Sequence, residues 1–402
     1  MEKRARRSIF GMVPGRVRWL ILLMSFSSLA TGYFWVATSA YLPQVGVPAG
    51  SVGLILAING VAFMLSAIPL GLLADRTGRK RILLIGLLWM PPALMVYAFT
   101  TNIAFLLVAS AIAGVAEGAF LTTWNALIAD MTTGEERKEA FALSFIVMAV
   151  TTGIGYALPF AFPSIAGLGG WTTFQVHEAF FIIMAATSLI TPVTLSRLLR
   201  DYNETPEPGL SFKKGKNLGP MLKFSAFNSL IGLGAGFIIP LIPLWLLLRF
   251  GVADTYSGPL LALASLTMGF ASIASAGLAR RHGTVKAIVM CQGSSTVFML
   301  ALAFVPGPAS AGLLYVIRSM LMNMAAPLTD SFLMGIISKE ERGLASAINS
   351  IVWRLPHSVT TVAGGVLLGM GLYDVPFFLA TAFYVIAIAL FYFTFRGVEP
   401  KD

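Results

Sequence analysis

Long apolar segments without charge recur along the whole 402-residue chain, and they restrict its fold more than any other feature. Each is about twenty residues long, enough for a helix to cross a hydrocarbon layer of about 30 Å. We count twelve such segments. Hydrophobic residues make up 57% of the chain and charged residues 11%, which excludes a soluble globular protein of ordinary composition. The sequence therefore predicts an all-α integral membrane protein with twelve transmembrane helices.

The distribution of positive charge predicts the orientation of these helices. A net charge of +10 would suggest a nucleic-acid partner in a soluble protein. Here, 25 of the 28 Lys and Arg residues fall in segments that share one side of the membrane if the N-terminus is cytoplasmic. Lys and Arg collect on the cytoplasmic side of multi-pass proteins. We therefore expect a multi-pass protein of the cell (plasma) membrane with both termini in the cytoplasm and no nucleic-acid partner.

Residues typical of enzymes and metal centres do not form a recognisable constellation. The single cysteine, Cys291, leaves no intrachain disulfide or cysteine-based metal site. His177, His282 and His357 fall in different predicted loops and helices, and there is no Walker sequence. We therefore expect no enzymatic activity, no cofactor, no metal and no ATP-driven transport.

Two short motifs recur at one common spacing, which indicates an internal repeat. The motif at residues 73–78 recurs at 278–283, and the motif at 135–140 recurs at 340–345, each shifted by 205 residues. Unrelated matches would have no reason to share an offset. The second copy lacks a counterpart of Asp75. The repeat predicts two related halves of six helices each.

The predicted organisation follows from this repeat and from one polar segment between the halves. Two pseudo-symmetric six-helix bundles cover residues 17–199 and 222–395. Residues 200–221 are rich in charged residues and proline, and we interpret them as a cytoplasmic linker. Cytoplasmic tails are expected at residues 1–16 and 396–402.

The stretch GLLADRTGRKRIL, residues 71–83, concentrates charges and glycines between two uncharged apolar runs. An ordinary positive loop would explain its cations but not its lone Asp75 or the glycines Gly71 and Gly78. The stretch resembles the loop signature of the major facilitator superfamily, G-x-L-a-D-R-x-G-R-k. The resemblance implies a twelve-span secondary transporter, similar to the drug/proton antiporter group, in which two six-helix bundles rock around a central site.

The same resemblance implies a conformational latch. In the superfamily, the loop Asp docks near the start of helix 11, and the loop Arg pairs with an acid at the inner end of helix 4. Asp75 matches the first role and Arg79 the second, with Asp130 as the partner acid. The alternative is a static cluster that only fixes topology. The predicted latch residues are Gly71, Asp75, Arg76, Gly78, Arg79 and Asp130.

Glu117 is the most informative charged residue within a predicted span. It lies about fourteen residues into the predicted helix 4, residues 103–130, roughly 21 Å along it at 1.5 Å per residue. An acid at that depth costs roughly 3 kcal/mol to insert, so it should face a cavity or a partner. Glu117 is therefore a candidate proton carrier or counter-charge for a cationic substrate. The alternative is a packing role beside Gly114 and Gly118, whose GxxxG spacing permits close helix contact.

Four more ionisable residues lie within predicted spans. The predicted helix 10, residues 310–338, carries Arg318 and Asp330. The predicted helix 11, residues 344–371, carries Arg354 and His357 three residues apart on one face. The resemblance implies that helices 1, 4, 7 and 10 line a central cavity, which would place Glu117 there together with the two residues of helix 10. Alternatively, Asp330 neutralises one of the two arginines in an internal pair.

Tyr33 and Asn125 complete the predicted proton or substrate site. Polar and aromatic residues of this kind also form hydrogen bonds between membrane helices, so a packing role is open for each of them.

The predicted function is proton-coupled efflux of small amphipathic organic compounds by a monomer. Residues 151–160, TTGIGYALPF, only partly match the glycine- and proline-rich run of proton-coupled drug exporters, since the Gly-Pro pair and the closing Gly-Gly are missing. One alternative is proton-coupled uptake or exchange of an anionic or zwitterionic metabolite held by Arg318 and Arg354. An alternative of another class is a transport-inactive membrane receptor or scaffold.

Overall fold

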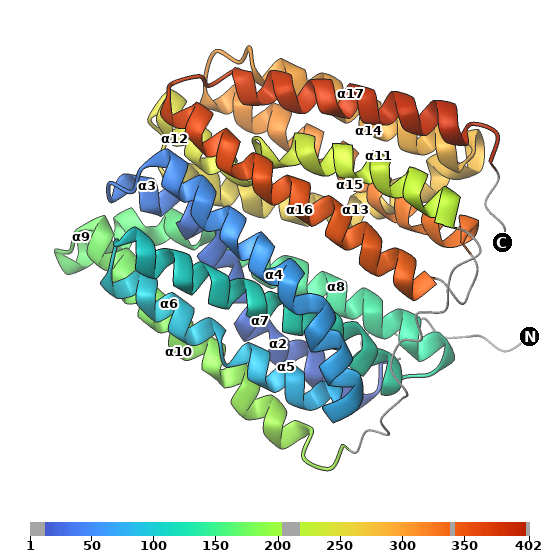
Figure 1. The fold of residues 1–402 in the computed structure, drawn as a ribbon. Coiled ribbons are helices and arrows are strands. Elements are labelled where there is room, and N and C mark those ends of the chain that lie inside the picture. Colours follow the sequence, from blue (N-terminus) through green and yellow to red (C-terminus); the bar gives the residue numbers. More distant parts are fainter. Residues whose placement is uncertain (1–12, 203–217, 338–341, 399–402) are drawn as a thin grey trace, which may run out of the picture. The chain divides into compact units, whose positions relative to one another are not determined.

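The structure is a computed structural model that describes residues 13–202, 218–337 and 342–398. All regular elements in these ranges are helical (Figure 1). In the first half they are α2 (Gly15–Val36), η1 (Ala37–Tyr41), α3 (Leu42–Gln44), α4 (Ala49–Thr77), α5 (Arg79–Leu87), α6 (Met90–Phe99), α7 (Ile103–Asp130), α8 (Gly134–Ala157), η2 (Leu158–Ala161), α9 (Phe162–Gly169) and α10 (Thr173–Leu198). In the second half they are α11 (Leu218–Gly236), η3 (Ile239–Leu241), α12 (Ile242–Phe250), α13 (Asp254–His282), α14 (Thr284–Leu302), α15 (Pro308–Ile336), α16 (Arg342–Gly369) and α17 (Val375–Phe395).

These elements confirm the predicted membrane fold. Ten helical segments of the described chain are long and apolar enough to cross a membrane. With α13 and α16, which are 29 and 28 residues long, they account for the twelve predicted transmembrane helices. The apolar segment at residues 82–100, one of the twelve counted in the sequence and predicted to form a single helix, is divided between α5 and α6. The split falls just before Pro91, whose ring nitrogen cannot donate a helical hydrogen bond.

The contacts divide the chain into two compact units. Unit 1 contains the described residues up to Trp35 and those from Ala62 to 202. Unit 2 contains Val36–Val61 and the described residues from 218 onwards. The first part of α4 therefore groups with the second unit. The predicted bundle limits at 17–199 and 222–395 stay a prediction, and most of the predicted linker lies outside the described residues.

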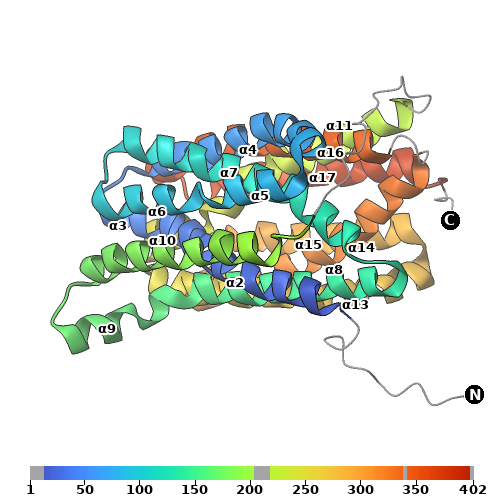
Figure 2. The same ribbon diagram turned by 90° about the horizontal axis from the view of Figure 1, so that it is seen from below.

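Within unit 1, α5 and α6 pack against α7 and α10. These helices lie side by side in both views (Figures 1 and 2). A core of buried, mostly aliphatic side chains joins α2, α5, α7, α8 and α10. Trp124 is the largest side chain of this core, and its indole nitrogen donates to Ser144 Oγ at 2.9 Å. Since a buried N–H requires an acceptor, this bond fixes α7 against α8.

Within unit 2, α11 packs against α16 and α17, and α14 packs against α15 and α17. An aromatic cluster joins α11, α15 and α17, where Phe224, Phe332 and Phe391 meet with ring centroids 5.5–6.4 Å apart. Such edge and offset contacts stabilise a packed core beyond their burial.

The repeat predicted from the sequence is visible in the backbone. Gly78 and Gly283 each separate two helices, with φ values of +101° and +80°. Gly46 and Gly251 also have positive φ, and both pairs are related by the same shift of 205 residues. Positive φ is readily adopted only by glycine. The two halves therefore share these two turns.

Candidate functional site

The turn between α4 and α5 carries the predicted latch residues. α4 ends at Thr77, and Gly78 reverses the chain in a conformation that disfavours any side chain. This sharp turn brings the last turn of α4 close to the first turn of α5. Asp75 and Arg79 consequently lie side by side, with Asp75 Oδ1 3.5 Å from Arg79 Nη2.

Arg79 also pairs with the acid at the end of α7. Its Nη1 lies 2.5 Å from Asp130 Oδ2, so the pair that the resemblance implied is present. Tyr202 Oη donates to the same carboxylate oxygen at 3.4 Å. Arg79 thus joins two acids from α4 and α7 within unit 1. Whether this cluster acts as a latch stays a prediction.

Two neighbouring cations hold the end of α10. Arg16 donates from Nε and Nη2 to the Leu198 carbonyl at 3.1 and 2.8 Å. Lys80 donates to the Leu199 carbonyl. The last carbonyls of a helix lack intrahelical partners and carry partial negative charge, so cations there are stabilising. Lys80 therefore has a structural role. The predicted latch residue Arg76, by comparison, is exposed.

Glu117 lies half-buried on α7, next to a close helix contact. A Cβ atom built on Gly118 would lie 2.6 Å from Ser66 Oγ and 3.3 Å from the Phe63 carbonyl, so α7 approaches α4 closely here. Gly71 faces Thr122 of α7 at 3.7 Å by the same measure. The packing alternative therefore has support at Gly118. The role of Glu117 in binding protons or substrate stays a prediction.

Tyr33 is completely buried inside unit 1, where it meets a histidine that sequence reasoning had set aside. Tyr33 Oη lies 3.0 Å from His177 Nδ1, and the His177 ring packs edge-on against Phe162 at 4.6 Å. These contacts join α2, α9 and α10. By contrast, Asn125 is exposed on α7.

Arg318 lies in the interior of unit 2. Only 4% of it is exposed, and its Nη2 donates to Tyr384 Oη of α17 at 2.8 Å. Its guanidinium carbon lies 5.7 Å from the centre of the same ring. On the other side, Ser295 Oγ of α14 donates to the Arg318 carbonyl at 3.0 Å. The positive charge of Arg318 is therefore directed toward α17, while the backbone of α15 at this residue is bonded to α14.

Asp330 does not neutralise Arg318 directly. It is exposed and lies twelve residues further along α15, which separates the two by about 18 Å of helix rise. Such a separation excludes an ion pair between these two side chains.

Arg354 and His357 lie half-buried on α16, where this helix packs against α11. The His357 ring stacks on Trp353 with centroids 4.7 Å apart. Two hydrogen bonds flank this segment. Asn228 Nδ2 donates to Asn349 Oδ1 at 2.7 Å, and Thr360 Oγ1 donates to the Leu233 carbonyl at 2.8 Å.

One buried acid was missed in the sequence. Asp254 is 1% exposed at the start of α13, and its Oδ1 accepts from Gln44 Nε2 at 3.2 Å. No signal in the sequence marked this acid as buried, because its partner Gln44 lies 210 residues away in the chain.

One family model matches the chain from residue 20 onwards. The model described as Major Facilitator Superfamily matches residues 20–231 and 224–402.

Two relatives in sequence and one in structure agree with this match. Multidrug resistance protein 1 of Bacillus subtilis is 23% identical over 381 residues, 92% of this chain and 94% of that protein. Quinolone resistance protein NorA of Staphylococcus aureus is 26% identical over 53% of this chain, and the chain spans about half of NorA, 49%. A bacterial homologue of the human lysosomal transporter Spinster, in an inward-facing and occupied conformation, superposes with a TM-score of 0.74 at 16% identity, over 96% of this chain and 98% of that one.

The structural likeness extends over 96% of the chain and therefore over both of its halves. The chain therefore belongs to the Major Facilitator Superfamily of membrane transporters.

Proposed function

We propose that this protein is a secondary transporter that exports small amphipathic organic compounds in exchange for protons. Similarity over almost the whole chain to a protein named for multidrug resistance supports this substrate class. We further propose that it works as a monomer by alternating access in the plasma membrane, with both termini in the cytoplasm.

The burial of Arg318 is the observation that favours export over the alternative function, uptake or exchange of an anionic or zwitterionic metabolite. Uptake of an anionic metabolite would need Arg318 and Arg354 to reach the substrate. Arg318 is 4% exposed and donates to Tyr384, so binding a substrate would require breaking a buried charged hydrogen bond. An exporter of amphipathic cations needs an acid instead. Glu117 supplies one near the middle of α7, a 28-residue helix.

In this proposal Glu117 exchanges a proton for the cationic substrate. Asp75, Arg79 and Asp130 form the latch in this proposal, and their charged contacts within unit 1 change between two states of the transport cycle.

The test uses the purified full-length protein in liposomes with an imposed pH gradient. Lipophilic cations, and separately organic anions, are added while dissipation of the gradient is recorded. Export predicts that cations dissipate the gradient and that Glu117→Gln removes this response. Glu178→Gln, which changes an exposed acid near the start of α10, is the matched control and should keep it.

Two outcomes would contradict the proposal. If only anions dissipate the gradient, the arginines of α15 and α16 become the candidate site and uptake or exchange replaces export. If Glu117→Gln keeps full proton coupling, another residue carries the proton.

A further inference from the structure

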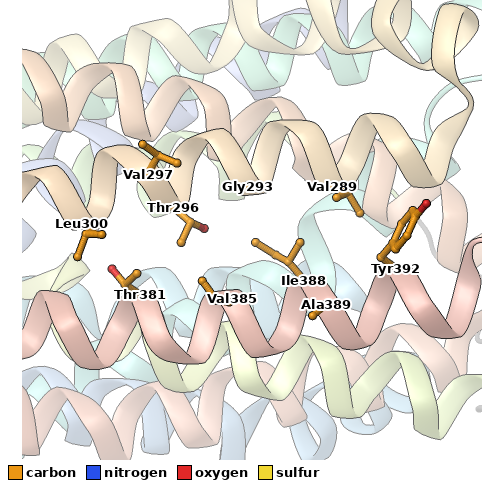
Figure 3. Close-up of a pocket in the computed structure, with 10 residues that line it drawn as sticks. All are labelled: Val289, Gly293, Thr296, Val297, Leu300, Thr381, Val385, Ile388, Ala389 and Tyr392. Atoms are coloured by element: carbon orange, nitrogen blue, oxygen red, sulfur yellow. The ribbon is translucent and has the colours of Figure 1, made fainter.

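An apolar groove lies between α14 and α17, on a part of unit 2 that the transport proposal does not use (Figure 3). Its volume is about 390 Å³. Val289, Gly293 and Val297 line it from α14, and Val385, Ala389 and Tyr392 line it from α17. All six belong to membrane-spanning helices.

Two small residues create the hollow. Gly293 has no side chain, and a Cβ atom built there would meet nothing within 4 Å. Ala389 faces the groove from α17 (Figure 3). Val297 and Val385 are 67% and 54% exposed, so the groove opens along its length to the outer surface of the helices. In a membrane-spanning segment, an apolar surface that opens sideways meets lipid chains.

The length of the groove matches one leaflet. It extends along α14 from Val289 to Leu300, eleven residues or about 16 Å of helix rise. The hydrocarbon core is about 30 Å thick, so each leaflet contributes about half of it. A single acyl chain has this extent and this chemistry.

One end of the groove is positively charged. α14 and α17 run antiparallel, with Val289 near Tyr392 and Leu300 near Thr381 (Figure 3). By that register, Lys286, one turn before Val289, and Arg396, one turn after Tyr392, flank the same end. Both are exposed, and neither helix contains an acidic residue. The positive-inside distribution predicts that this end is cytoplasmic.

We propose that this groove is a specific site for an anionic phospholipid. One acyl chain occupies the groove beside Gly293, and the phosphate group pairs with Lys286 and Arg396. Basic residues at the end of a contact between membrane helices are suited to acidic headgroups. The aromatic ring of Tyr392 lies where the chain meets the headgroup, as interfacial tyrosines do.

Affinity is tested by native mass spectrometry of the full-length protein, titrated with phosphatidylglycerol or phosphatidylcholine that carry the same acyl chains. Phosphatidylglycerol should bind up to about 25-fold more tightly, about fivefold for each cation. Lys286→Gln with Arg396→Gln should remove most of this preference. Arg281→Gln, an exposed cation at the end of α13, is the charge control and should leave the preference unchanged.

Position is tested with the same two lipids carrying a photoactivatable group in one acyl chain, in nanodiscs, with peptide mapping. Labelling should concentrate on residues 289–300 and 381–392. Gly293→Phe should remove it for both lipids, because the ring fills the hollow. Gly277→Phe on α13 is the matched glycine control and should keep the labelling. A Cβ atom built on Gly277 also meets nothing within 4 Å.

The proposal is overturned if both lipids bind equally to the unmodified protein, or if labelling spreads evenly over the exposed helices. It is also overturned if a transported cation, rather than lipid, displaces the label, since the groove would then belong to the substrate path. Should Gly293→Phe fail to fold, the charge variants still decide the question. The site does not depend on the direction of transport, so a failed exporter assay leaves this test intact.

Discussion

The buried pair of Arg318 and Tyr384 gives a sharp prediction for stability. Tyr384→Phe removes only the hydroxyl that accepts a 2.8 Å hydrogen bond from the guanidinium. The ring remains, and with it the contact of the cation with the ring face at 5.7 Å. A hydrogen bond to a charged group contributes about 1.5–3 kcal/mol, and at 4% exposure water does not replace it. We expect the free energy of unfolding to fall by about 2 kcal/mol.

The assay is equilibrium unfolding of the purified protein in mixed dodecyl maltoside and SDS micelles, followed by circular dichroism. Tyr392→Phe makes the same chemical change on the same helix at a half-buried position, and it should alter the free energy by less than about 0.5 kcal/mol. Adding Arg318→Met to Tyr384→Phe should restore most of the loss, because the charge that lacks an acceptor is then removed.

Two results would refute this reasoning. A loss below about 0.5 kcal/mol for Tyr384→Phe would mean that the bond is replaced by water or another acceptor. Unchanged stability of Arg318→Met together with abolished transport would place the guanidinium in the substrate site instead of the core.

Three further perturbations follow from the structure of unit 1. Gly78→Ala should lower the free energy of unfolding by about 2 kcal/mol, since φ of +101° is strained for alanine. In the same unfolding assay Gly167→Ala should not lower it, because Gly167 is helical and an added Cβ meets nothing within 4 Å. Gly155→Leu should reduce the yield of folded protein in size-exclusion chromatography, because a Cβ there would lie 2.9 Å from the Tyr33 nitrogen and force α8 from α2, whereas Gly167→Leu should not. Asp75→Asn should slow turnover in liposomes while leaving substrate affinity within a few-fold, and unchanged turnover would remove the latch role.

The sequence was sufficient for the order of helices and for the charged turn. Segments of about twenty apolar residues must form helices in a bilayer, because their backbone groups find no water to bond with. The charges that interrupt these segments locate the turns. The common shift of 205 residues gave the repeat, and Gly78 and Gly283 confirm it with their positive φ values. The pairing of Arg79 with Asp130 was accessible through resemblance, and the structure contains it.

The direction of each polar side chain within a span was decided only by the tertiary structure. In a soluble helix, the apolar face identifies the core. In a membrane helix, the face toward lipid is as apolar as the face toward the neighbouring helix, so the sequence contains no such signal. The predicted site residues Arg318 and Tyr33 are therefore found against Tyr384 and His177, inside their units, 66 and 144 residues away in sequence. The sequence alone determined which residues enter the membrane, because that depends on local composition, whereas packing between distant helices determined which of them face each other.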